Sequence, residues 1–114
     1  MKPGQRVALV GVPDREIREL LRERGVAWDE KPVPGANVIV LGAESVAELG
    51  QLPALRRLLA PDGGIWVVAP KGGREPREAQ VLAAGKAAGL MDVKVARFSE
   101  THTAHRFAIP RRER

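Results

Sequence analysis

The chain has 114 residues, of which 44% are hydrophobic and 29% charged, ordinary values for one folded domain that exclude global disorder. It contains no cysteine, which excludes disulfides, thiolate metal sites and a cysteine nucleophile. The N-terminal residues form no apolar signal core, and no apolar run approaches the roughly 20 residues of a membrane helix, so we expect one cytoplasmic domain (1–114) without membrane contact. Abundant Arg, Ala and Pro with scarce Met are typical of a heat-adapted or GC-rich source.

The formal net charge of +5 is concentrated at the C-terminal end. Residues 94–114 carry 6 Lys/Arg against 2 Asp/Glu, whereas residues 1–93 carry 13 against 12. The basic tail 111–114 predicts either nucleic-acid binding through phosphate contacts or a solvated end that aids solubility, and the second interpretation is the simpler.

The first half of the chain begins with a strand-length apolar run at 6–12. Asp14 is placed to cap a helix whose apolar stripe is Ile17, Leu20 and Leu21. A short edge strand is expected at 26–28.

A second buried strand is expected at 37–42. Ser45 and Glu48 have the spacing of a capping box and predict a helix starting there. Pro53 should interrupt this helix, which then resumes up to Ala60.

Residues 61–64 have the composition of a tight turn, in which glycine supplies a positive φ. The strand that follows, 65–69, is apolar at every position, which predicts a central parallel strand with both faces covered. A glycine-rich loop at 70–76 then leads to a helix at 77–88, with Gly89 as its C-terminal cap.

The last two expected strands, 93–98 and 106–110, are joined by a short link without helical pattern, so they must be antiparallel. With right-handed crossovers, these elements predict an α/β fold: a single Rossmann-like three-layer sandwich with a mostly parallel sheet and a C-terminal antiparallel hairpin. The expected strand order is second, first, third, fourth, sixth, fifth.

Two segments resemble class I S-adenosylmethionine-dependent methyltransferases. Residues 59–68 are similar to the helix–turn–strand in the middle of those enzymes, and residues 88–98 are similar to the approach to their penultimate strand. The resemblance implies a trimmed methyltransferase-like fold.

A closer resemblance is to an uncharacterised bacterial family of small domains. It is carried by Pro-Asp-Gly-x-x-Trp-x-x-x-Pro-Lys at 61–71, Ala-Gly-Leu-x-Asp-Val-Lys-Val at 88–95 and Thr-x-Thr-Ala-x-Arg-Phe at 101–107. This chain has His102 where that family commonly has tryptophan.

The cofactor motifs of the methyltransferases are not matched. Their Gly-x-Gly-x-Gly loop corresponds to Gly11-Val12-Pro13, with one glycine and a proline that removes a backbone donor. Asp29 or Glu30 corresponds only loosely to the acidic residue that holds the ribose. We therefore expect no S-adenosylmethionine cofactor and assign no catalytic residue.

A ligand site is predicted at the carboxyl edge of the sheet, where open α/β folds bind ligands. Gly11, Pro13 and Ser45 should face one another across the crevice, with Lys71 and Arg74 beside them as an anion clamp. The simpler interpretations are a helix cap for Ser45 and a solvated loop lysine for Lys71.

No metal site is expected, because His102 and His105 have no further ligands near them and read as polar loop residues. The leading functional hypothesis is a non-catalytic methyltransferase-like domain that binds a protein partner or a small anion. The alternatives are a divergent small S-adenosylmethionine-dependent methyltransferase and a nucleic-acid-associated basic protein. Self-association is left open.

Overall fold

The computed structural model describes residues 1–13 and 15–114, so the expected cap Asp14 lies outside the described residues. The strands are β1 (Val7–Val10), β2 (Trp28–Asp29), β3 (Ala36–Gly42), β4 (Leu59–Pro70), β5 (Met91–Arg97) and β6 (His102–Ala108). The helices are α1 (Arg15–Glu23), α2 (Leu52–Leu58) and α3 (Glu78–Ala87), with short 3-10 helices η1 (Ala47–Gln51) and η2 (Arg111–Glu113). Within the described ranges, no helix is long and apolar enough to cross a membrane.

All six strands form one mixed sheet in the order β2-β1-β3-β4-β6-β5, the order expected from the sequence. Strands β1 to β4 pair in parallel, whereas β6 runs antiparallel to both of its neighbours, β4 and β5. The parallel part follows from the crossovers through α1 and α2, which are long enough to return the chain to the starting edge.

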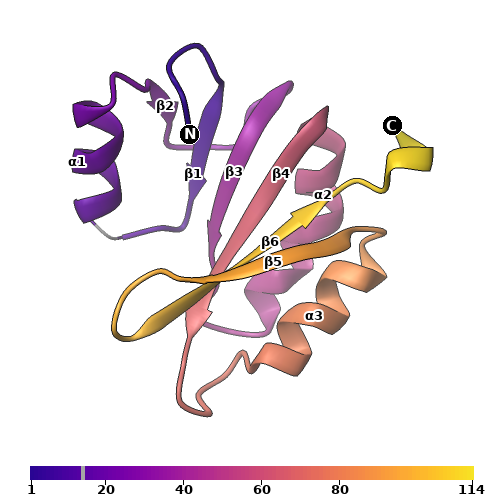
Figure 1. The fold of residues 1–114 in the computed structure, drawn as a ribbon. Helices are drawn as coiled ribbons and strands as arrows, with labels where there is room; N and C mark the ends of the chain where they lie inside the picture. The colour runs from indigo at the N-terminus through magenta and orange to yellow at the C-terminus, as the bar shows by residue number, and fades with distance from the viewer. Residues whose placement is uncertain (14) are drawn as a thin grey trace.

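The helices lie on both sides of the sheet (Figure 1). Helix α1 buries Ile17 and Leu21 against one face, in a cluster with Val7 and Leu9 of β1. Helices α2 and α3 cover the opposite face and belong to a second, larger cluster.

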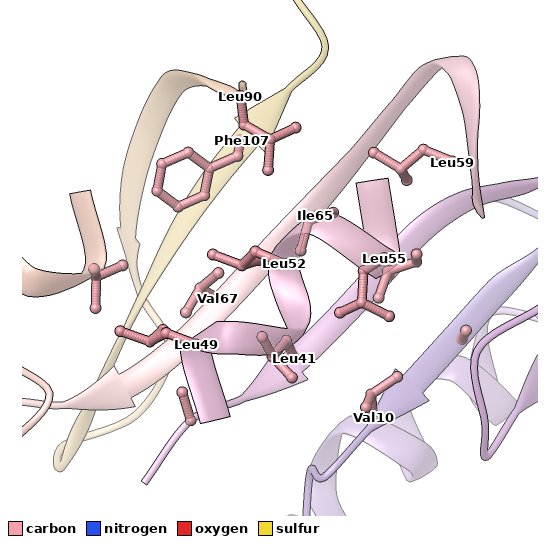
Figure 2. Close-up of a cluster of buried hydrophobic side chains, with 14 of the residues drawn as sticks. Val10, Leu41, Leu49, Leu52, Leu55, Leu59, Ile65, Val67, Leu90 and Phe107 are labelled. Atoms are coloured by element: carbon pink, nitrogen blue, oxygen red, sulfur yellow. The ribbon is translucent and has the colours of Figure 1, made fainter. Parts of the chain in front are cut away.

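Strand β4 lies at the centre of both clusters. Ile65 and Val67 point into the larger cluster, where they meet Leu52, Leu55 and Phe107 (Figure 2). Their neighbour Val68 points into the α1 cluster. Alternate side chains of one strand therefore enter different layers, which explains why this segment is apolar at every position.

The prediction of a tight turn at 61–64 is wrong, because β4 already begins at Leu59 and stays extended through these four residues. The register between β3 and β4 shifts here, because Ala36 pairs with Leu59 whereas Val38 pairs with Gly64. Strand β4 therefore has more residues than β3 between these two pairs. A Cβ atom at Gly63 would lie 2.9 Å from the carbonyl oxygens of Ala36 and Asn37. Glycine is needed here for the close approach of two backbones and not for a positive φ.

The prediction that a helix starts at Ser45 is also wrong. The 3-10 helix η1 begins at Ala47 without a side-chain cap, and the α-helix starts only at Leu52. The hydroxyl of Ser45 donates to the Glu48 carboxylate at 3.3 Å instead of capping a backbone N–H. Pro53 occupies the first turn of α2, where a missing N–H has no cost, so it opens that helix and does not interrupt one.

The last strand starts earlier than the expected 106–110. Strand β6 begins at His102, because β4 extends to Pro70 and the whole of β6 pairs with it. The pairing runs from Gly64 with Ala108 to Pro70 with His102. Backbone pairing overrides the polar composition, so the two histidines expected in a loop lie in a strand.

Gly85 of α3 makes the tightest helix–sheet contact, and its replacement tests this packing. A Cβ atom added there would overlap with the fully buried ring of Phe107. Overpacking of this kind costs about 1–3 kcal/mol, against the roughly 1 kcal/mol by which alanine favours a helix. We expect Gly85→Ala to lower the free energy of unfolding by up to about 2 kcal/mol in urea denaturation. The control Gly50→Ala, where an added Cβ meets no described atom within 4 Å, should not lower it.

Candidate functional site

The carboxyl ends of β1 and β3 lie against each other. A Cβ atom at Gly42 would overlap with the carbonyl oxygen of Gly11, and one at Gly11 would lie 3.3 Å from the carbonyl oxygen of Gly42. Val12, the next residue, is only 5% exposed and packs in the α1 cluster. The turn after β1 therefore folds across the end of β3.

Glu48 organises the loop after β3. Its Oε1 accepts hydrogen bonds from the backbone N–H of Glu44 at 3.1 Å and from the Ser45 hydroxyl at 3.3 Å. A Cβ atom at Gly11 would lie 3.9 Å from Oε2 of the same carboxylate. The expected site residues Gly11 and Ser45 thus gather around a carboxylate, which would repel an anion.

His102 links this loop to β6. Its Nε2 lies 2.7 Å from Oε1 of Glu44, and its Nδ1 lies 2.8 Å from the Thr101 hydroxyl. The backbone N–H of Lys71 donates to the carbonyl of Thr101 at 2.9 Å. The ends of β3, β4 and β6 are therefore connected along one edge of the sheet.

A basic pocket of about 270 Å³ lies at the carboxyl end of β4, between the following loop, the start of α3 and β6. Lys71, Arg74 and Arg77 line it, together with Glu78 as the one acidic group. The loop reaches around the pocket because Gly72 and Gly73 adopt positive φ angles of 76° and 80°, which glycine tolerates without strain.

His105 contributes a buried polar group to the same pocket. It is 4% exposed, and its Nε2 lies 3.6 Å from Oε2 of Glu78. Its Nδ1 is buried and has no hydrogen-bond partner in the described part of the chain. The first turn of the ten-residue helix α3 opens beside it, and a helix N-terminus favours negative charge. The three cations and the helix dipole together favour an anionic guest.

The five predicted site residues thus fall into two places. Lys71 and Arg74 line the basic pocket, whereas Gly11, Pro13 and Ser45 are not among its lining residues. Three further residues line this pocket that the sequence patterns did not predict: Arg77, Thr103 and His105. A strand pattern starting at His102 would have placed Thr103, His105 and Phe107 on one face, because strand side chains alternate.

S-adenosylmethionine, which the resemblance implies, is not accommodated by the close contact between the ends of β1 and β3. The Gly11–Gly42 contact fills the space between the two strand ends. Of the two candidate ribose acids, Asp29 and Glu30, Glu30 is already engaged: Arg18 donates to it at 2.6 and 2.8 Å, and the indole N–H of Trp28 donates at 2.7 Å. The residues present therefore do not fit the cofactor.

The basic tail is held by the fold at two points. Glu113 of η2 pairs with Arg56 of α2 at 2.6 Å, and Nε of Arg114 donates to the carbonyl of Ile109 at 2.9 Å. Arg111 and Arg112 are exposed, and Nε of Arg112 lies 3.9 Å from Oε2 of Glu113. Across residues 1–13 and 15–114, no group of three or more metal-ligating side chains is gathered.

No protein-family model matches the chain, and no curated protein matches it. Solved structures do. The TehB-like SAM-dependent methyltransferase from Corynebacterium glutamicum is 12% identical over 96% of this chain and 82% of its own, with a TM-score of 0.67. A chain of the complex between the Haloferax volcanii Trm112 methyltransferase activator and a putative methyltransferase is 12% identical over 96% and 84%, with a TM-score of 0.69. The calicheamicin-biosynthesis methyltransferase CalO1 is 19% identical over 92% and 49%, with a TM-score of 0.68.

The chain has a methyltransferase-like fold. Identities of 12% and 19% carry the likeness of fold alone, and the chain spans about half of CalO1. The resemblance to the uncharacterised bacterial family stays a prediction.

The hydrogen bonds that Glu30 accepts from Arg18 and Trp28 can be tested by titrating its carboxyl group. Hydrogen bonds from Arg18 and then from Trp28 lower the pKa of the Glu30 carboxyl to about 2. We expect carboxyl-detected NMR to find this pKa in the folded protein, and Arg18→Gln to raise it markedly. The pKa of Glu30 is lower in the folded state than in the unfolded state, so the ionised carboxylate stabilises the fold. This contribution to stability is complete above about pH 4.5 and is lost as the pH falls through 2. An ordinary pKa for Glu30, or no response to Arg18→Gln, would contradict the contact.

Proposed function

We propose that this chain is a methyltransferase-like domain that binds a small anionic ligand in the basic pocket after β4. The observation that carries the proposal is the convergence of Lys71, Arg74 and Arg77 on one pocket beside the start of α3. The pocket lies at the carboxyl end of a central strand, where α/β sheets bind ligands. Three cations against one carboxylate leave it net positive.

The ligand class that suits this geometry is a phosphate-like or carboxylate group. Lysine and arginine donate charge-assisted hydrogen bonds to such oxygens. No nucleophile or acid–base pair is assigned, so the proposed role is binding.

Replacement of Lys71 tests the proposal. In calorimetric titrations with inorganic phosphate and pyrophosphate, we expect Lys71→Ala to weaken binding by about 1–3 kcal/mol, or roughly 5- to 150-fold, as loss of a charge-assisted hydrogen bond does. The matched control Lys86→Ala removes an equal charge from the far end of α3 and should have little effect.

The same titration separates the nucleic-acid hypothesis from the pocket. If Lys71→Ala left anion binding intact and the double replacement Arg111→Ala/Arg112→Ala abolished it, the pocket would be the wrong site. A steep salt dependence of binding to single-stranded DNA that requires Arg111 and Arg112 would then favour the nucleic-acid-associated protein.

The second candidate function is a divergent S-adenosylmethionine-dependent methyltransferase, which the structural neighbours favour. It requires the turn at 11–13 to move away from Gly42. It also requires Glu30 to break its contact with Arg18. Proline at position 13 stiffens that turn and removes a donor, which opposes such a movement.

We expect no calorimetric binding of S-adenosylmethionine tighter than about 100 μM, which corresponds to roughly 5.5 kcal/mol. Methyl transfer itself needs that binding, so a tighter complex would overturn the first proposal in favour of the second. S-adenosylhomocysteine serves as the second probe, because it carries the same nucleoside without the sulfonium charge.

A further inference from the structure

The face of the sheet that carries α1 is partly open. A groove of about 510 Å³ runs beside α1 and reaches across β4 and β6 to β5. Its floor is apolar and includes Val68, Trp66, Phe98 and Ala104. Trp66 and Phe98 are only half-buried, although they pack on the core.

The two faces of the sheet are unequally covered. Helices α2 and α3 lie on one face, whereas α1 is the only helix on the other within the described residues (Figure 1). Parallel strands such as β3 and β4 normally have helices over both faces, because both carry apolar side chains. The groove lies where a second helix would complete this layer.

The two walls of the groove carry opposite charges. On α1, Glu16, Glu19, Leu20 and Glu23 all line it, a spacing of three, four and seven residues that places them on one helix face. Leu20 is 42% exposed, in the middle of this acidic stripe.

The opposite wall is basic. Nζ of Lys94 of β5 lies 5.6 Å from the centre of the Trp66 ring on the groove floor. Arg106 of β6 pairs in register with Trp66 and Lys94, so it stands on the same face. A guest between the walls meets carboxylates on one side and cations on the other.

We propose that this groove binds an amphipathic helix of a protein partner. The helix lays an apolar stripe on Trp66, Phe98 and Leu20, a basic flank along α1 and an acidic flank along β5. A second copy that inserted its own α1 would set glutamates against glutamates, so the charges favour a different chain. The proposal is independent of the anion pocket, which lies on the other face of the sheet.

Synthetic helical peptides with one leucine stripe and different flanks test the proposal. One has a lysine flank and a glutamate flank, one has glutamate on both flanks, and one has lysine on both. By fluorescence anisotropy we expect the mixed peptide to bind the wild-type protein about tenfold more tightly than either uniform peptide, as a few exposed ion pairs allow.

Charge reversal on one wall supplies the decisive variant. The double replacement Glu19→Lys/Glu23→Lys makes both walls basic, so the all-glutamate peptide should become the tightest ligand, again by about tenfold. Both residues are exposed, so the fold should persist, as circular dichroism would check. Asp62→Lys, at an exposed acidic residue that does not line the groove, should leave the wild-type preference unchanged.

Several outcomes overturn the proposal. The mixed peptide fails to bind, the three peptides bind equally, or the preference survives charge reversal. If light scattering finds a wild-type dimer that Leu20→Glu converts to a monomer, a second copy fills the groove and the partner helix is wrong.

Discussion

Strand β4 is the constraint on which the other elements depend. It is hydrogen-bonded to β3 on one edge and to β6 on the other, and its side chains enter both hydrophobic clusters. A strand in this position can have neither a polar face nor a free edge. The antiparallel β6 pairs with β4 along the full length of β6, and this pairing carries His102 and His105 to the end of β4 where the basic pocket lies.

The two faces that meet at β4 carry different chemistry. At its carboxyl end, Lys71 leaves the strand toward the α3 side and joins a basic pocket. In its middle, Trp66 points to the opposite side, into an apolar groove with charged walls. Alternation along one strand therefore separates the basic pocket, where we propose a small anion, from the groove, where we propose a partner helix.

The methyltransferase-like fold and the local geometry point in different directions. The neighbours in fold are S-adenosylmethionine-dependent enzymes, but the turn after β1 rests on Gly42, and Glu30 is held by Arg18. A fold fixes where a crevice can form, whereas the side chains and turns at its mouth decide what enters. Here those residues close the usual crevice, and positive charge gathers at the end of the next strand along.

The sequence by itself determined the strand order and the buried strands, because continuous apolar runs such as 65–69 have only one stable place in an α/β sheet. It also predicted Lys71 and Arg74 as site residues, since residues directly after a central strand emerge at its carboxyl edge. Only the tertiary structure decided that β4 runs straight through Pro61–Gly64, that His105 is buried, and that Ser45 turns to Glu48. Each of these outcomes depends on a neighbour distant in the chain, which local composition does not encode.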